Sequence, residues 1–478
     1  MHIQHLLTQQ FVWQPTAQQQ AAFALLEEFL HTFDPSSCFL LKGYAGTGKT
    51  TLISALVKIL PALQKRAVLL APTGRAAKVM RYYSGRKALT IHKKIYRKKS
   101  AASLELDFSL AENLHENTLF IVDEASMISD NQEQFFSRSL LDDLISYVKS
   151  GNNCALMFVG DTAQLPPVGM LESPALDANY LEANYQLRVF CYELQEVVRQ
   201  QQASGILYNA TKVRNDIRLE QQEESLPFPQ FHTRGFKDIF RMNGDRLIEG
   251  LHYSYDHFDI ENTIVVCRSN RSANLYNQHI RNQILFRDEE ITGGDLIMVV
   301  RNNYYWLQQH DEKSTGFIAN GDMAKVRKVS NIHDQHGFRF ADISLEFIDD
   351  EELEPVLCRV LLDSLHVDAP NMPREQQKQL YESIALDYSD IPFKKDRLEA
   401  IKKDPYYNAL QIKFAYAITC HKAQGGQWPC VFVDQGYLND EMLNTEFLRW
   451  LYTAITRASE QLFLVNFNPK FYGEGELK

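Results

Sequence analysis

The sequence lacks several features that would place it in other classes of protein. No apolar run is long enough to cross a bilayer, and the first residues lack the charged-then-apolar order of a signal peptide. The seven cysteines include no Cys-x-x-Cys pair, so neither a zinc site nor a disulfide framework is indicated. A net charge of −10 excludes a uniformly basic surface. We therefore expect a cytoplasmic protein with no membrane partner.

The 478 residues exceed what one hydrophobic core usually contains, so several domains are expected.

Because the chain as a whole is acidic, contact with nucleic acid would need local basic patches. One such patch spans residues 86–99, which contain seven Lys or Arg residues and no acid. A solvated charged loop is the alternative interpretation of this patch.

A glycine-rich motif, Gly43-Tyr44-Ala45-Gly46-Thr47-Gly48-Lys49-Thr50, joins an apolar run of strand character to a segment with helical spacing of apolar residues. Glycines allow backbone amides to converge on phosphate oxygens, and a helix N-terminus favours negative charge. The motif therefore predicts a nucleotide phosphate site. Lys49 would hold the β- and γ-phosphates, and the Thr50 hydroxyl would ligate Mg²⁺.

Two adjacent carboxylates end a later apolar run, Ile121-Val122-Asp123-Glu124. Because successive strand residues point in opposite directions, we expect the two acids to take different roles. Asp123 would hold Mg²⁺ through its water shell, and Glu124 would orient and deprotonate the attacking water.

Other segments supply single candidates. Gln164, after the run Val159-Gly160-Asp161, is placed to sense a γ-phosphate, and Arg199 and Arg457 each follow an apolar helical face. A planar guanidinium stabilises the charge of a transferred phosphoryl group. A lone arginine at a helix end is usually a surface charge, so these two arginines depend on the other motifs.

The motifs, taken in order, resemble those of superfamily 1 helicases, in particular the RecD-like and Dda-like branch. They are 43–50, 71–77, 123–126, 160–167, 198–200, 419–427 and 452–458. Thr90-Ile91-His92 and a β-rich insertion before Thr419 are similar to that branch. Asp123 follows Thr73 by 50 residues, which leaves no room for the large insertion of UvrD-like helicases.

The resemblance implies an α/β fold with two RecA-like P-loop motor domains and a small β-rich, SH3-like insertion in the second. Residues 1–200 would form the first motor domain, with a short insertion at about 86–116. The second would comprise 201–290 and 411–478, and the β-rich insertion with a helical segment would span 291–410.

The resemblance also implies the site. Gln19 would read the adenine edge, with Gln18 and Gln20 as alternatives in register. The residues expected around ATP and Mg²⁺ are Gly43, Ala45, Gly46, Thr47, Gly48, Lys49, Thr50, Thr51, Asp123, Glu124, Gln164, Arg199, Gly425 and Arg457. Those expected along the nucleic acid are Thr73, His92, His421 and Lys422.

The implied function is ATP-dependent movement along single-stranded DNA, 5′ to 3′, with unwinding at single-strand/duplex junctions by a monomer. Residues 96–115, where relatives place a strand-separating pin, give no clear hairpin signal, and no nuclease motif is present. The sequence leaves three alternatives open. They are an ATP-switched nucleic-acid clamp, a translocase that displaces proteins without separating strands, and an RNA helicase.

Overall fold

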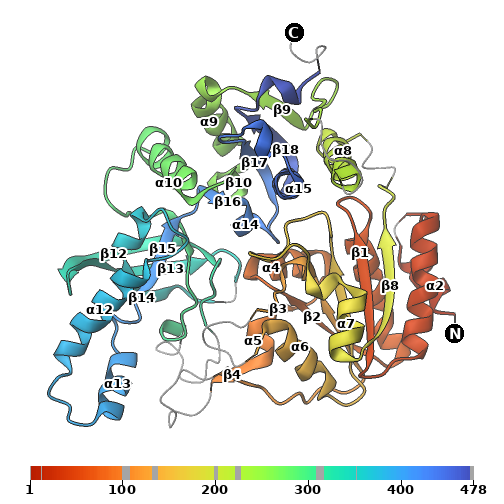
Figure 1. The fold of residues 1–478 in the computed structure, drawn as a ribbon, viewed down its shortest axis with the longest axis horizontal. Coiled ribbons are helices and arrows are strands. Elements are labelled where there is room, and N and C mark those ends of the chain that lie inside the picture. Colours follow the sequence, from red (N-terminus) through yellow and green to blue (C-terminus); the bar gives the residue numbers. More distant parts are fainter. Residues whose placement is uncertain are drawn as a thin grey trace.

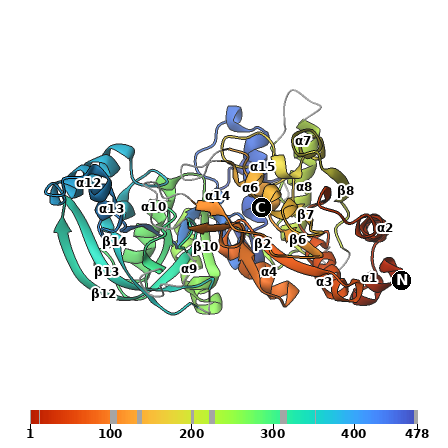
Figure 2. The ribbon, with the colours of Figure 1, turned by 90° about the horizontal axis from the view of Figure 1, so that it is seen from below.

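The computed structural model describes residues 2–473 except 12, 99–107, 132–137, 199–202, 221–227, 308–316 and 351–352. The fold is mixed α/β, with two parallel sheets and one closed barrel. The first sheet and the barrel lie at opposite ends of the molecule, and the second sheet lies beside both (Figures 1 and 2).

The first sheet has six strands in the order β3-β2-β6-β7-β1-β8, all parallel. The strands are β1 (Ser37–Gly43), β2 (Arg66–Ala71), β3 (Ala88–Thr90), β6 (Thr118–Val122), β7 (Ala155–Gly160) and β8 (Arg188–Leu194). Four of them coincide within two residues with the apolar runs 38–42, 67–71, 118–123 and 154–159. The loops that carry the candidate motifs therefore leave the same edge of one sheet.

Helices cover both faces of this sheet. They are α1 (Ile3–Gln10), α2 (Ala17–His31), α3 (Lys49–Ile59), α4 (Gly74–Ser84), α5 (Ile91–Ile95), α6 (Leu140–Lys149) and α7 (Ala178–Tyr185). Alternation along β1 assigns Phe39 and Leu41 to a core with α1 to α4, and Cys38 and Leu40 to a core with α5 to α7.

A short antiparallel strand pair, for which no clear signal is present in the sequence, follows helix α5. β4 (Tyr96–Lys98) pairs antiparallel with β5 (Phe108–Leu110). Two three-residue strands are too short for an alternating apolar pattern to be recognised in a basic segment. The segment 96–115, which gives no clear hairpin signal in the sequence, thus contains an antiparallel strand pair.

The second sheet has five parallel strands in the order β16-β10-β17-β18-β9. They are β9 (Ile239–Met242), β10 (Thr263–Cys267), β16 (Ala417–Thr419), β17 (Trp428–Asp434) and β18 (Ala458–Val465). The accompanying helices are α8 (Gly205–Glu220), α9 (Leu247–Phe258), α10 (Asn270–His279), α14 (Cys420–Ala423) and α15 (Thr445–Ile455).

The closed barrel contains five strands between β10 and β16. They are β11 (Leu296–Val299), β12 (Met323–Gln335), β13 (Phe338–Phe347), β14 (Val356–Leu361) and β15 (Leu410–Phe414). Helices α12 (Arg374–Asp387) and α13 (Lys394–Lys402) precede β15. Because β15 pairs with β11 and β14, the barrel reaches residue 414 and not the expected 410.

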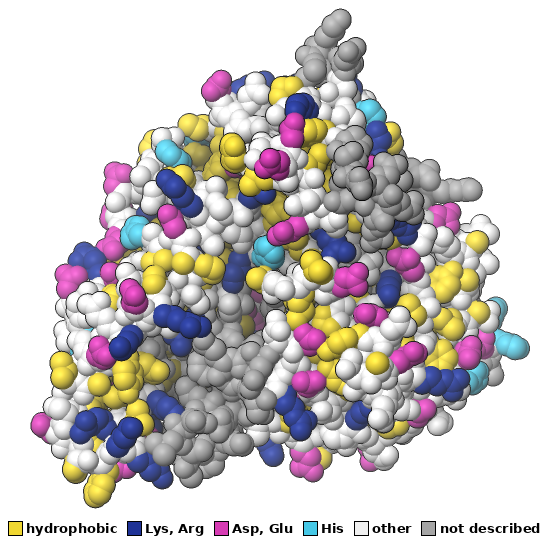
Figure 3. Space-filling view, in the orientation of Figure 1, with side chains coloured by type: hydrophobic (Ala, Val, Ile, Leu, Met, Phe, Trp, Pro, Cys, Tyr) yellow, Lys and Arg dark blue, Asp and Glu magenta, His cyan; other side chains and the backbone are white. Residues whose placement is uncertain are grey.

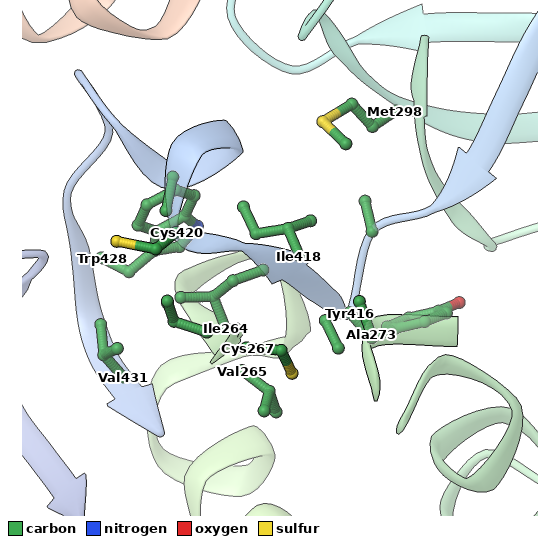
Figure 4. Close-up of a cluster of buried hydrophobic side chains, with 14 of the residues drawn as sticks. Ile264, Val265, Cys267, Ala273, Met298, Tyr416, Ile418, Cys420, Trp428 and Val431 are labelled. Carbon is green, nitrogen blue, oxygen red and sulfur yellow. The ribbon is translucent and has the colours of Figure 1, made fainter. Parts of the chain in front are cut away.

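One hydrophobic core runs from the second sheet into the barrel. Figure 4 shows Ile264 and Ile418 of the sheet near Met298 of β11, and all three side chains belong to one buried cluster. Buried Asp295 reinforces this junction, accepting hydrogen bonds from Arg281, Arg287 and the Tyr416 hydroxyl. The barrel and second sheet therefore share both an apolar and a polar network.

Basic and acidic side chains are interspersed on the face shown in Figure 3, as the net charge of −10 leads one to expect. Among the helices of the described residues, none has the length and apolar character that crossing a membrane demands.

Candidate functional site

The loop between β1 and α3 has the backbone shape that phosphate binding requires. Gly46 and Gly48 are left-handed, with φ of 77° and 87°, a region that other residues rarely adopt. A Cβ atom on Gly43 would lie 2.9 Å from the Thr47 hydroxyl. Because α3 begins at Lys49, the amides of its first turn adjoin this loop and favour an anion there.

Lys49 and Thr50 occupy the first turn of α3. The Lys49 ammonium donates to the carbonyl oxygens of Gly43 at 2.5 Å and Tyr44 at 3.0 Å, so its charge lies over the loop. Thr50 and Thr51 are exposed. A hydroxyl oxygen at this position suits Mg²⁺, which prefers oxygen ligands.

Gln19 is buried, with 4% of its surface exposed. Its carbonyl oxygen accepts from the Thr16 amide at 3.0 Å, and its amide nitrogen donates to the Thr47 carbonyl at 3.1 Å. Gln18 accepts from the amides of Gln195 and Glu196. Gln19 is thus the glutamine that supports the phosphate loop, while its contact with adenine stays a prediction.

Asp123 and Glu124 follow β6 in a tight turn. The expectation that strand alternation separates them is wrong, because β6 ends at Val122 and Glu124 has a left-handed backbone with φ 53° and ψ 37°. The turn itself separates the two side chains. Asp123 Oδ1 accepts from the Glu124 amide at 2.9 Å, and Oδ2 accepts from the Tyr83 hydroxyl at 2.6 Å.

Opposite charges converge on Glu124. Burial raises the pKa of its carboxyl, Arg457 and Lys49 lower this pKa, and Asp123 raises it further. Burial also raises the pKa of Asp161, against the lowering effect of Lys49. Groups that shift the same pKa lie near one another. The structure therefore gathers these five residues at one site.

The loop after β7 meets helix α15 of the second sheet. The Tyr452 hydroxyl donates to Asp161 Oδ2 at 2.7 Å and accepts from the Ala45 amide at 2.9 Å. The Leu165 amide donates to the Thr453 hydroxyl at 2.9 Å. Gln164 is 7% exposed, and its amide oxygen has no hydrogen-bond partner among the described residues.

Arg457 is 2% exposed, and the hydrogen-bond partners of its guanidinium belong to the same part of the chain as Arg457, around the second sheet. Its guanidinium donates to the carbonyls of Thr453 and Gly426 and to the Thr456 hydroxyl. Its charge nevertheless acts on Glu124 of the first sheet. Arg199 lies outside the described residues.

Thr73 caps helix α4, accepting from the Ala76 amide at 3.2 Å. Gly425, which was expected at the nucleotide, lies against this cap. A Cβ atom on Gly425 would be 3.2 Å from the Thr73 hydroxyl and 3.0 Å from Ala76 Cβ. The loop after α14, beside the second sheet, is therefore in close contact with the start of α4, beside the first sheet.

The other residues predicted to contact nucleic acid are His92, His421 and Lys422. His92 and Lys422 lie close to residues of the segment between β11 and β12 of the barrel. The ring of His92 lies 6.0 Å from that of Phe317, and the Lys422 ammonium donates to Asn320 Oδ1. Burial lowers the pKa of Lys422 to about 8 and also lowers the pKa of His421. A desolvated ammonium of this kind interacts strongly with a phosphate.

Two tyrosines of the site, Tyr83 and Tyr452, are not among the residues that the motifs predicted. Tyr452 belongs to the quoted motif 452–458, so its position was a signal that could have been used. Tyr83 stands in a helix far from Asp123 in sequence, and no local pattern marks it.

Two family models match the chain. The model described as an AAA domain matches residues 16–224, and the UvrD-like helicase C-terminal domain matches 414–465. The chain is 23% identical over 453 residues to the ATP-dependent DNA helicase dda of Enterobacteria phage T4, covering 89% of this chain and 93% of the phage protein. Over most of its length this chain is therefore similar in sequence to an ATP-dependent DNA helicase.

Other proteins match different shares of this chain. It is 34% identical over 130 residues to the ATP-dependent RecD2 DNA helicase of Deinococcus radiodurans, which is 27% of this chain and 16% of that protein. It is 26% identical to uncharacterized protein R530 of Acanthamoeba polyphaga mimivirus, covering 98% of that protein. A solved structure of Pif1 helicase from Bacteroides, in complex with ADP-AlF3 and ssDNA, aligns at 14% identity and TM-score 0.46 over 96% of this chain and 95% of that one.

Proposed function

We propose that this chain is a superfamily 1 helicase of the RecD and Dda type, which hydrolyses ATP between its two parallel sheets and uses the cycle to move 5′ to 3′ along single-stranded DNA, separating duplex at junctions. The similarity to two ATP-dependent DNA helicases and to the UvrD-like helicase C-terminal domain supports this activity. The observation that carries the mechanism is the pair of hydrogen bonds that the Tyr452 hydroxyl, in helix α15 beside the second sheet, makes with Asp161 and the Ala45 amide in loops of the first sheet. Hydrolysis would then require both units.

In this proposal the loop residues Gly43 to Thr51 hold the triphosphate, with Lys49 at the β- and γ-phosphates. Thr50 and Asp123 supply the oxygen atoms that would hold Mg²⁺, which provides charge neutralisation at the phosphates when bound. A buried carboxyl with a raised pKa suits Glu124 as the base that takes a proton from water. Gln164, Arg199 and Arg457 would stabilise the transferred phosphoryl group.

We propose that the two parallel sheets are RecA-like motor domains and that the barrel is the SH3-like insertion of the family. The single-stranded DNA would contact Thr73 and His92 of the first motor domain and His421 and Lys422 of the second. The β4–β5 hairpin occupies the segment where relatives place a strand-separating pin, which supports unwinding as well as movement. We further propose that the protein acts as a monomer.

Unwinding of duplexes that carry either a 5′ or a 3′ single-stranded tail, with ATP and Mg²⁺, tests the proposal. Strand displacement only from the 5′-tailed duplex supports it, and displacement only from the 3′-tailed duplex contradicts the polarity. ATPase activity stimulated by single strands without displacement indicates a clamp or a protein-displacing translocase. Equal activity on RNA strands indicates the RNA helicase alternative. Lys49→Ala is the control that removes hydrolysis.

A further inference from the structure

Tyr83 makes a hydrogen bond that neither the motifs nor the proposed mechanism uses. It lies near the end of α4, and its hydroxyl donates to Asp123 Oδ2 at 2.6 Å. The other oxygen, Oδ1, accepts from the Glu124 amide at 2.9 Å. Two donors, one on each oxygen, therefore set the orientation of this carboxylate.

This arrangement leaves the carboxylate able to bind further ligands. A carboxylate oxygen can accept two hydrogen bonds, so each oxygen of Asp123 keeps one lone pair for water of a metal shell. Partners that orient a ligand residue from behind are known to control metal affinity. Tyr83 occupies such a position, on helix α4, which packs against β2, the neighbour of β6 in the sheet.

Helix α4 carries Tyr83 near its C-terminal end and begins directly after Thr73, which is predicted to contact nucleic acid. The helix begins after the Thr73 cap and runs for 11 residues, from Gly74 to Ser84, about 16 Å at 1.5 Å per residue. Its first turn contacts Gly425 of the second unit. A helix of this length moves as a rigid body, so a displacement at Thr73 would also displace Tyr83.

We propose that Tyr83 is a positioning residue that holds Asp123 for Mg²⁺ and thereby links strand binding at Thr73 to metal affinity at the ATP site. This inference rests on the proposed roles of Asp123 and Thr73. Tyr83 would not touch the nucleotide or the metal. Its contribution lies in the orientation of the carboxylate.

The test compares Tyr83→Phe with Tyr82→Phe, a matched control because Tyr82 is 92% exposed and adjacent in sequence. Binding of Mn²⁺ to the full chain with ADP is measured by electron paramagnetic resonance, with and without oligo-dT. We expect Tyr83→Phe to weaken Mn²⁺ binding about tenfold, the lower end for loss of an orienting partner. Tyr82→Phe should leave the affinity unchanged.

A second readout separates positioning from a general structural effect. In steady-state ATPase assays Tyr83→Phe should raise the Mg²⁺ concentration for half-maximal rate, while kcat recovers at saturating Mg²⁺. Its melting temperature should match that of Tyr82→Phe. Equal Mn²⁺ affinity in the two variants overturns the role of Tyr83. An effect of oligo-dT on Mn²⁺ affinity that persists unchanged in Tyr83→Phe overturns the link to the strand.

Asp123→Ala distinguishes failure of this inference from failure of the proposed site. If Asp123→Ala binds Mn²⁺ as the unmodified chain does, the metal role of Asp123 is wrong and the inference falls with it. If Asp123→Ala loses Mn²⁺ binding while Tyr83→Phe keeps it, the site stands and only the role of Tyr83 is rejected.

Discussion

The hydroxyl of Tyr452 lies 2.7 Å from Asp161 Oδ2, although the two residues are 291 positions apart in the chain. The same hydroxyl accepts from the Ala45 amide in the phosphate loop. One side chain of the second unit thus joins two loops of the first. Together with the bond from the Leu165 amide to the Thr453 hydroxyl, this contact joins helix α15 to the loops of the first sheet.

Tyr452→Phe should therefore weaken closure around ATP. The change leaves a buried carboxylate oxygen and a backbone amide without their partner, at a cost of about 1–3 kcal/mol. We expect kcat/KM for ATP to fall roughly tenfold to a hundredfold, since each 1.4 kcal/mol is about tenfold. Steady-state ATPase assays measure this, with Tyr437→Phe as the control because Tyr437 is 79% exposed. Wild-type kinetics in Tyr452→Phe would show that the contact is dispensable.

Arg457→Ala should separate nucleotide binding from hydrolysis. An arginine that stabilises transferred phosphoryl charge contributes about 10³–10⁵ in kcat, so hydrolysis should fall by about a thousandfold or more while binding of a fluorescent ADP analogue persists. Because the guanidinium also holds the carbonyls of Thr453 and Gly426, Arg457→Lys and thermal melting serve as controls for folding. Retained ATPase in either variant would remove Arg457 from the site.

The affinity of the protein for single-stranded DNA should decrease as the pH rises through 8. Burial lowers the pKa of Lys422 to about 8, so its ammonium is mostly charged at pH 7 and mostly neutral at pH 9. Above pH 8, binding a phosphate requires proton uptake, which weakens affinity by at most about tenfold per pH unit. Fluorescence anisotropy with labelled oligo-dT at constant salt measures the trend. Lys422→Arg keeps its charge, and an identical pH profile in that variant would assign the titration to another group.

Asp295 should be much more important for folding than Asp350. Asp295 has 0% exposure and pairs with Arg281 at 3.0 Å and Arg287 at 2.7 Å, so Asp295→Ala leaves buried charges unpaired and should cost about 3–5 kcal/mol of unfolding free energy. The Lys93–Asp350 pair, at 3.2 Å, is partly exposed, and Asp350→Ala should cost less than about 1 kcal/mol. Urea denaturation compares the two, and similar midpoints would contradict the assignment of the buried network.

The sequence was informative wherever local chemistry demands particular residues. Glycines before a lysine predicted the turn from β1 into α3, whose Gly46 and Gly48 are left-handed, and an apolar run before two acids predicted that β6 ends just before Asp123. The sequence was misleading where backbone geometry, and not residue type, decides the arrangement. The left-handed turn at Glu124 and the pairing of β4 with β5 depend on contacts that no short window of sequence contains.

The residues by themselves determined which loops could hold phosphate and which strands would be buried, because glycine conformation and hydrophobic periodicity act over a few positions. Only the tertiary structure decided that Tyr83 bonds to Asp123 and that Tyr452 bonds to Asp161. Their partners are tens to hundreds of positions away, and the order of strands in a sheet, not distance along the chain, brings such groups within hydrogen-bonding range.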